Sequence, residues 1–366
     1  MPNKVKILIS GGGTGGHIFP AIAIANALKD SLADVDIHFV GAIGRMEMDK
    51  VPLAGYPITG LWISGLQRKL TTKNILFPVK VIASIIKAYK IINKFKPDVV
   101  IGTGGYASGP LLYVASKKHI PTLIHEQNAF PGITNKLLGK SVDKVCVSYK
   151  NMGKYFAKDK ITLTGNPIRK EILKLTPTKE ESLSFFGLSH DKKTLLIIGG
   201  SQGAKQVNIA VAENLRQILG LNLQLLWQTG QGSKHIADDV ADGNKNVVVT
   251  EFIQEMDKAY VASDFIISRA GAIAIAEIVA AKKPAVFIPL PSAAEDHQTK
   301  NAKTLVDGDV ALLVSEKNAI DELPRTLKKL VEDNNLQKTI IENLSKFSFS
   351  DAAGTIANEV IKLIKS

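Results

Sequence analysis

Cysteine is almost absent from this chain of 366 residues, in which Cys146 is the single one. One cysteine excludes an internal disulfide and any metal site made of several cysteines. Because Cys146 lies between Val145 and Val147 in an apolar, strand-like segment, we expect a small buried hydrophobic residue rather than a reactive thiol. A reducing cytoplasm suits this cysteine usage.

Long hydrophobic runs are also lacking. No uncharged apolar stretch approaches the ~20 residues that a membrane-spanning helix needs, and no apolar core of the signal-peptide kind stands near the N-terminus. A hydrophobic content of 45% with 22% charged residues is typical of a globular protein. A chain of this length is long enough for about two domains.

Acidic residues are missing from one long segment, Val51 to Pro97. Residues 1–165 hold 22 Lys and Arg against 9 Asp and Glu, whereas the rest of the chain is nearly balanced, so the net charge of +12 resides in the first half. This asymmetry indicates that the first half faces an anionic partner. The acid-free segment contributes eight cations: Arg68, Lys69, Lys73, Lys80, Lys87, Lys90, Lys94 and Lys96.

A helix is predicted from Phe77 onward, because apolar residues recur there at three- and four-residue spacing. Two interpretations stay open: a surface helix packed on a sheet, or a face for anionic lipid, preceded by exposed Ile75, Leu76 and Phe77. Nucleic acid is a weaker candidate, because the segment has few aromatic residues and no recognition motif. The apolar positions are Val79, Ile82, Ile86 and Tyr89, and the lysines of one stripe are Lys80, Lys87, Lys90 and Lys94.

Glycine is concentrated between Gly11 and His17, where an apolar strand predicted at 5–10 leads into a helix predicted at 20–30. Bare backbone and the unpaired N–H groups of a helix start make this an anion site with an imidazole at its edge. A P-loop is excluded, because Lys and Ser or Thr do not follow the last glycine. A tight turn without function remains the plain alternative.

A dinucleotide site is the next alternative, because Gly11, Gly13 and Gly16 fit its glycine spacing. That site needs an acidic residue after the second strand, predicted at 36–40, and residues 41–45 provide none. Arg45 could instead contact a 2′-phosphate. The third interpretation is a nucleotide-sugar or acceptor site that uses His17 in the chemistry.

Strands and helices alternate along the whole chain, which predicts parallel sheets. In the first half, polar loops at 102–110 and 125–128 follow short strands, and such loops gather at the carboxyl ends of parallel strands. The pattern begins again after 165–168. We therefore predict two Rossmann-like domains that face one another across a cleft. Further helices are predicted at about 45–54, 321–333, 335–346 and 351–365, and further strands at 99–101, 122–124, 194–198, 223–228, 246–250, 264–268 and 285–289.

Three polar residues of the second half are candidate ligand contacts. Glu277 follows a strand and a glycine turn, where a carboxylate can accept both ribose hydroxyls. Gln298 and Asn301, three apart at a helix start, could read sugar hydroxyls. The carboxylate pairs at 34 and 36 and at 307 and 309 lie before a strand and in a turn, so we predict no metal.

Eight segments, spread in order over nearly the whole chain, resemble the MurG family of bacterial N-acetylglucosaminyltransferases. The resemblance implies the GT-B fold, inverting transfer from UDP-N-acetylglucosamine to lipid I to give lipid II in peptidoglycan synthesis, no cofactor, and peripheral attachment to the cytoplasmic face of the cell membrane. The segments are 12–21, 102–110, 125–128, 165–169, 199–204, 251–253, 268–272 and 297–302.

The resemblance also implies roles for individual residues. Ser201 would meet the diphosphate, Arg169 the nucleotide, Ile253 the uracil through its backbone, and Glu277 the ribose. The turn comprising Ala272, Ile273, Ala274, Ile275 and Ala276 would hold phosphate; this chain has Ala274 and Ala276 where the family often has hydroxyl residues, so contacts there would come from backbone N–H. Gln298 would bind the sugar, with Thr14, Gly15, Gly16 and Asn128 assisting across the cleft.

Two candidates for the general base stay open, His17 and Glu126. A helix start disfavours imidazolium and keeps His17 able to accept a proton, whereas a nearby diphosphate would favour the charged imidazolium. We expect domains at 1–165 and 166–349, with a helix in 350–366 packing back on the first. The rival functions are a UDP-sugar epimerase on a similar fold, an NAD(P)-dependent oxidoreductase and a non-catalytic membrane adaptor.

Overall fold

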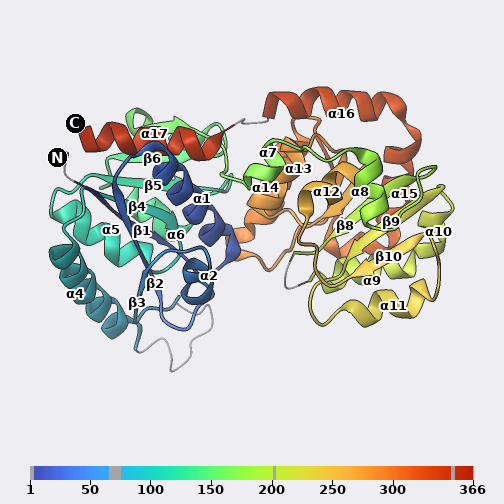
Figure 1. Ribbon diagram of the computed structural model, residues 1–366. Helices are drawn as coiled ribbons and strands as arrows, with labels where there is room; N and C mark the ends of the chain where they lie inside the picture. The colour runs from blue at the N-terminus through green and yellow to red at the C-terminus, as the bar shows by residue number, and fades with distance from the viewer. Residues whose placement is uncertain (1–3, 66–75, 201–202, 348–350, 366) are drawn as a thin grey trace. The chain divides into compact units, whose positions relative to one another are not determined.

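The chain folds into two units, each built on a parallel sheet (Figure 1). The computed structural model describes residues 4–65, 76–200, 203–347 and 351–365. The first unit comprises Met1–Ile168 together with Asp351–Ser366, and the second comprises Arg169–Ser350. Both chain ends therefore belong to the first unit.

The sheet of the first unit has seven strands in the order β3-β2-β1-β4-β5-β6-β7, all parallel. They are β1 Val5–Gly11, β2 Val35–Ala42, β3 Ile58–Leu61, β4 Val99–Gly104, β5 Thr122–Glu126, β6 Lys144–Val147 and β7 Ile161–Leu163. The helices are α1 Gly15–Ser31, α2 Glu47–Leu53, α4 Phe77–Phe95, α5 Ser108–Lys117, α6 Ile133–Leu138 and α17 Ala352–Lys365, with 3-10 turns at Met152–Lys154 and Lys158–Lys160.

Apolar side chains on both faces of this sheet form two separate cores. On β1, Ile7 and Ile9 pack with α1 and α17, whereas Leu8 packs on the other face with α4 and α5. A parallel strand buried on both faces needs apolar residues at successive positions, and this explains the unbroken apolar run of β1. Figure 1 shows α17, the last helix of the chain, lying beside α1.

The second unit has a six-stranded parallel sheet in the order β10-β9-β8-β11-β12-β13. The strands are β8 Lys193–Ile198, β9 Leu223–Gln228, β10 Val247–Thr250, β11 Phe265–Ser268, β12 Ala285–Phe287 and β13 Leu312–Leu313. The helices are α7 Lys170–Leu173, α8 Lys179–Phe185, α9 Lys205–Glu213, α10 Leu215–Leu219, α11 Lys234–Ala241, α12 Met256–Ala262, α13 Ala272–Ala280, α14 His297–Val306, α15 Ala319–Glu332 and α16 Asn334–Phe347, with 3-10 turns at Ala294–Asp296 and Glu316–Asn318.

Two Rossmann-like parallel sheets are what the alternating pattern predicts, and they confirm that part of the fold class. The start of α1 differs from the prediction: the helix begins at Gly15, so Pro20 lies inside it. Pro20 cannot donate to the carbonyl four residues earlier. The helix nevertheless continues through it, because Ile18 and Ile24 bury against the sheet. Three short strands, β3, β7 and β13, are not predicted from the sequence.

Candidate active site

The first glycine loop carries His17 at the carboxyl end of β1. Thr14 is the N-cap of α1, and Gly15, Gly16 and His17 form the first helical turn. A helix of 17 residues presents backbone N–H groups and a partial positive charge at that turn. Gly13 has φ +85°, a conformation that favours glycine. The predicted glycine turn into a helix is thus present in this unit, and anion binding there stays a prediction.

Glu47 organises this loop, and the sequence analysis misses it. Its carboxylate accepts from the N–H of Gly13 at 2.9 Å and from the N–H of Ala42 at 2.9 Å. The side chain is fully buried, and a Cβ on Gly12 would lie 2.1 Å from Glu47 Oε1. The carboxylate therefore occupies the space beside a bare glycine and fixes the loop to the start of α2.

A second glycine loop, after β4, packs directly against the first. Gly12 N–H donates to the carbonyl of Gly104 at 3.3 Å, and a Cβ on Gly105 would lie 2.3 Å from the Gly12 oxygen. The His17 ring contacts the same loop, because a Cβ on Gly104 would lie 2.8 Å from His17 Nδ1. Thr103 Oγ1 donates to the carbonyl of His17 at 2.8 Å. These glycines are needed for close backbone approach.

The third loop, after β5, reaches His17 through Gln127. His17 Nδ1 lies 3.3 Å from Gln127 Oε1, and Gln127 Nε2 lies 3.1 Å from His125 Nδ1. His125 Nε2 lies 3.0 Å from the carbonyl oxygen of Gly165. Burial lowers the pKa of His125 to about 4, so its ring is neutral near pH 7. Three polar loops thus meet at one edge of this sheet.

Glu126 holds the loop that follows it. Oε1 accepts from Asn128 N–H at 3.0 Å and Asn128 Nδ2 at 3.2 Å, and Oε2 accepts from Gly132 N–H at 3.2 Å and Asn135 Nδ2 at 2.8 Å. Burial raises the pKa of this carboxyl, and the hydrogen bonds from Asn128 and Asn135 oppose the rise. With four donors on two buried oxygens, Glu126 is well placed to shape the loop and poorly placed to collect a proton.

In the second unit, Arg169, Glu277 and Tyr260 form one hydrogen-bonded group. Arg169 Nε and Nη2 donate to Glu277 Oε1 and Oε2 at 3.0 and 3.2 Å. Tyr260 Oη donates to Glu277 Oε2 at 3.1 Å. Glu277 and Tyr260 are buried, and burial raises the pKa of Tyr260 well above its ordinary value. The structure therefore brings two of the predicted nucleotide contacts together.

A hollow of about 270 Å³ opens beside Arg169. It is lined by Arg169, Glu171, Ile172, Gln254, Met256 and Asp257. Ile253, which precedes Gln254 in the sequence, is buried, and its N–H donates to Gln228 Oε1 at 3.3 Å. The predicted uracil contact at Ile253 would therefore use its carbonyl oxygen.

The predicted phosphate turn begins α13. Gly271 is the N-cap, and the helix runs from Ala272 through Glu277 to Ala280. Ala272 and Ile275 are buried, whereas Ile273, Ala274 and Ala276 are partly exposed. The exposed part of the turn offers backbone rather than side-chain donors, as the alanines predict.

The two predicted sugar-reading amides lie in different surroundings. Gln298 is partly exposed, and its Oε1 accepts from Leu290 N–H at 2.9 Å. Asn301 is fully buried, and its Nδ2 donates to the carbonyl of Ala270 at 3.4 Å. The two amides do not share one exposed face. Arg269 supports the same region, because it donates to the carbonyls of Ile288 and Pro289 and pairs with Glu316.

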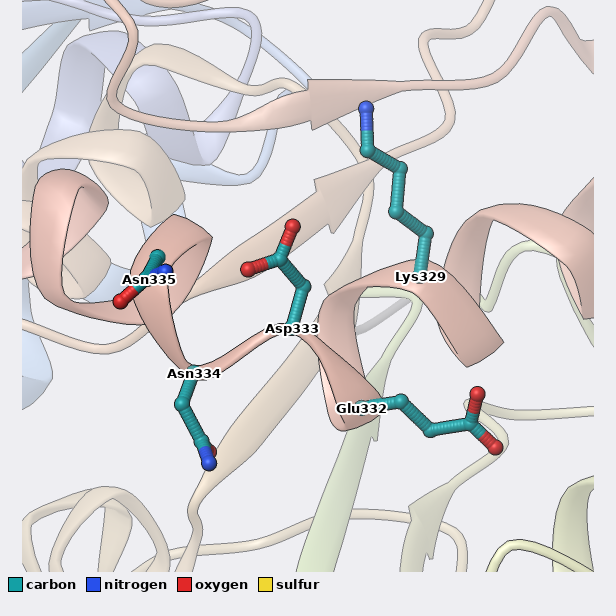
Figure 2. A pocket seen from close by; sticks show the side chains of 5 residues that line it. All are labelled: Lys329, Glu332, Asp333, Asn334 and Asn335. Atoms are coloured by element: carbon teal, nitrogen blue, oxygen red, sulfur yellow. The ribbon is translucent and has the colours of Figure 1, made fainter.

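Ser201, the predicted diphosphate contact, lies outside the described residues. A larger hollow of about 620 Å³ lies at the junction of α15 and α16 and is lined by Lys329, Glu332, Asp333, Asn334 and Asn335 (Figure 2). Figure 2 shows Lys329 and Asp333 pointing to one side of this turn and Asn334 to the other. None of these residues is a predicted contact, and all of them are polar, whereas ligand pockets are mostly apolar. The larger volume therefore does not mark the active site.

Comparison with known proteins supplies the family. The Glycosyltransferase family 28 N-terminal domain matches residues 7–147, and the corresponding C-terminal domain matches residues 194–356. A Flavobacterium psychrophilum protein is 46% identical over 365 residues, with 99% of each chain covered. Its name is UDP-N-acetylglucosamine–N-acetylmuramyl-(pentapeptide) pyrophosphoryl-undecaprenol N-acetylglucosamine transferase. The crystal structure of Acinetobacter baumannii MurG matches with a TM-score of 0.79 at 28% identity, over 98% of this chain and 99% of that one.

The chain belongs to the MurG family. The MurG match together with the two sheets confirms the predicted GT-B fold class.

Epimerases share this fold but are more distant from the chain. A UDP-GlcNAc 2-epimerase from Neisseria meningitidis, solved bound to UDP-GlcNAc, matches with a TM-score of 0.68 at 16% identity over 98% of this chain and all of the other. Identity at this level shows the fold alone. The epimerase alternative is therefore not favoured over membership of the MurG family, and neither is the NAD(P)-dependent one.

Proposed function

We propose that this protein transfers N-acetylglucosamine from UDP-N-acetylglucosamine to the muramyl sugar of undecaprenyl-pyrophosphoryl-N-acetylmuramyl-pentapeptide, which converts lipid I to lipid II in peptidoglycan synthesis. The observation that carries the proposal is the end-to-end similarity to a relative with that name. Anion-binding backbone at the start of α1 and an arginine–carboxylate pair in the second unit suit such substrates.

We assign the nucleotide sugar mainly to the second unit. Glu277 would accept the ribose hydroxyls, Arg169 would contact the nucleotide, and Ile253 would offer its carbonyl to uracil. Backbone N–H groups of the α13 turn would hold phosphate, because a helix start favours negative charge. Gln298, whose oxygen already accepts from Leu290, would donate its amide hydrogens to the sugar.

We assign the acceptor chemistry to the first unit, with His17 as general base. His17 takes the proton from the acceptor hydroxyl, whose oxygen forms a bond to the anomeric carbon while the bond from that carbon to the UDP oxygen breaks, with inversion. Thr14, Gly15, Gly16 and Asn128 stay predicted contacts of the sugar. Glu126 is the weaker candidate base, because four hydrogen bonds already occupy its carboxylate.

We further propose that α4 attaches the protein to an anionic membrane at the cytoplasmic face. One face of α4, with buried Ser84, Ala88 and Ile92, packs on the sheet, whereas the apolar residues at three- and four-residue spacing are 50–60% exposed. Within the described parts of the chain, no helix is long and apolar enough to span a bilayer. The exposed side chains are Val79, Ile82, Ile86 and Tyr89.

Cations surround these apolar side chains. Lys80 Nζ lies 5.7 Å from the ring centre of Trp62, and Lys118 Nζ lies 4.7 Å from that of Tyr89. Lys87, Lys90 and Lys94 are exposed. Amphipathic surfaces of this composition bind anionic lipid by apolar insertion and charge together. The remaining predicted members of this surface, Arg68, Lys69, Lys73 and Ile75, lie outside the described residues.

The proposed activity is tested by incubating the protein with radiolabelled UDP-N-acetylglucosamine and lipid I and following the label into the lipid phase. We expect label in a lipid product together with release of UDP. An epimerase would consume the donor without any lipid. An oxidoreductase would show thermal stabilisation by NADPH and none by UDP-N-acetylglucosamine. Either result would contradict the proposal.

A further inference from the structure

The orientation of one buried amide is fixed by its surroundings. Gln127 is 1% exposed, and its Nε2 lies 2.8 Å from the carbonyl oxygen of Thr103. A carbonyl oxygen can only accept, so the atom that faces it must be the amide nitrogen. The reversed orientation would place two oxygens in contact. Gln127 Oε1 consequently faces the other way, toward His17.

His125 agrees with this orientation. Its Nε2 lies 3.0 Å from the Gly165 carbonyl oxygen, so Nε2 carries the ring proton and donates it. Its Nδ1 then accepts from the second hydrogen of Gln127 Nε2, at 3.1 Å. Both hydrogens of that nitrogen are thereby assigned, one to Thr103 and one to His125. The buried part of the network has one consistent arrangement of protons.

The same logic reaches His17. Gln127 Oε1, which can only accept, lies 3.3 Å from His17 Nδ1, a length common for catalytic hydrogen bonds before substrate binds. We propose that Gln127 is a positioning residue that holds His17 in the tautomer protonated at Nδ1, so that Nε2 is the nitrogen that accepts the proton. This assignment of a role to Gln127 rests, for its catalytic meaning, on the proposed function.

An amide suits this position for an electrostatic reason. A carboxylate there would stabilise the charged imidazolium and make His17 hold its proton more strongly. A neutral amide orients the ring and selects the tautomer without adding a charge next to the predicted anion-binding backbone at the start of α1. The plane of the His17 ring is held as well, because the ring lies directly against the backbone of Gly104, where there is no room for a Cβ.

The tautomer can be read directly by NMR. In protein labelled with ¹⁵N-histidine, two-bond ¹H–¹⁵N correlations at about pH 8, above the ordinary histidine pKa of about 6.5, distinguish Nδ1–H from Nε2–H. A His17→Ala variant assigns the signal among the seven histidines. We expect Nδ1–H for His17 and Nε2–H for His125. An Nε2–H pattern for His17 in the wild-type protein would overturn the proposal, whether or not the enzyme transfers sugar.

Two variants test whether Gln127 is the cause. Gln127→Met keeps the length of the side chain but removes both polar atoms, and Gln127→Asn keeps the amide but is too short to reach Thr103 and His17 together. We expect a mixture of tautomers at His17 and a kcat lower by roughly 10- to 100-fold, less than loss of the base itself would cost at ~10²–10⁴-fold. Calorimetry should show nearly unchanged affinity for UDP-N-acetylglucosamine.

His38 serves as an internal control, because its Nε2 bonds Thr59 Oγ1 in the same unit, away from this network. Its NMR pattern should be the same in all variants. Unchanged His17 signals and unchanged kcat in folded Gln127→Met and Gln127→Asn would overturn the positioning role. Failure of the proposed function would show differently, as an absence of transfer in the wild-type protein with the His17 tautomer still as stated.

Discussion

Arg169 and Glu277 face each other through two hydrogen bonds, Nε to Oε1 at 3.0 Å and Nη2 to Oε2 at 3.2 Å. The pair joins the residue before α7 to the second turn of α13, two segments 108 residues apart in sequence. The carboxylate predicted to bind ribose is thus held by a guanidinium. If ribose hydroxyls bind Glu277, they must share or replace these bonds, so we expect the two predicted contacts to act as one unit.

Donor binding should divide between Glu277 and Gln298. Glu277→Ala should weaken both UDP and UDP-N-acetylglucosamine, because it removes the ribose contact and leaves Arg169 without this partner. Gln298→Ala should leave UDP affinity nearly unchanged and reduce discrimination among UDP-sugars, because its proposed contact is the sugar. Isothermal titration with UDP and with several UDP-sugars measures both. Equal impairment of plain UDP binding in the two variants would contradict the division.

His17→Ala should lower kcat by about 10²–10⁴-fold, the usual worth of a positioned base. Donor affinity should stay nearly intact, since the nucleotide is assigned mainly to the second unit. Steady-state kinetics with lipid I, together with calorimetry for the donor, give the two quantities. Glu126→Gln is the comparison variant. If it loses kcat while His17→Ala keeps it, Glu126 is the base.

Charge reversal on α4 should weaken membrane attachment. Lys80→Glu and Lys87→Glu together should reduce co-sedimentation with vesicles containing anionic lipid, and the remaining binding should depend less on salt, because fewer screened charges contribute. Lys328→Glu with Lys338→Glu, exposed positions of α15 and α16, is the matched control. Equal binding by all three proteins across a salt series would leave α4 as an ordinary surface helix.

The sequence predicts the sheets better than the site. Buried parallel strands are apolar over successive residues, and the glycine turns after them are visible in sequence, so most strands, the first glycine loop and His17 are predictable. Short β3, β7 and β13 carry two to four residues each and give too little pattern. For α4 the sequence predicts the helix and leaves open which face packs, because spacing alone does not distinguish a buried apolar face from an exposed one.

Side-chain partners across loops are the other missed feature. Glu47 cannot be identified from sequence, because it binds Gly13, 34 residues earlier, and only the pairing of β1 with β2 brings the two together. Its place in the first turn of α2 is a weak local signal, since carboxylates are common there. The burial of Asn301 is likewise invisible in a polar helix start. Ser201 stays a prediction.

Stability of the first unit should fall with acid because of His125. Its pKa is lowered from 6.5 to about 4 by burial, so its contribution is present above pH 6.5 and is lost as pH falls through 4. The difference between these two pKa values corresponds to about 3 kcal/mol of unfolding free energy. Urea unfolding followed by Trp62 fluorescence in a Trp227→Phe background measures it. His125→Gln should show a flatter pH dependence over this range, and an identical dependence would contradict the assignment.

Ile356→Ala should destabilise the first unit by about 2–5 kcal/mol, because a fully buried side chain of α17 leaves a cavity beside α1. The unfolding transition followed by Trp62 fluorescence should move to a lower urea concentration. The transition followed by Trp227, in the second unit, should move little. Ile341→Ala, on an exposed position of α16, is the control with the same change of side chain. A shift confined to the Trp227 transition would disprove this packing.

Because α17 is the last helix of the chain but packs in the first unit, the first unit cannot finish folding until the second unit has been synthesised. When the ribosome has made residues 1–168, the hydrophobic surface of α1 that receives Ile356, Ala357 and Val360 is still uncovered. It stays so until the 182 residues of the second unit have emerged. During that interval the nascent first unit exposes apolar surface, which favours aggregation and binding by chaperones.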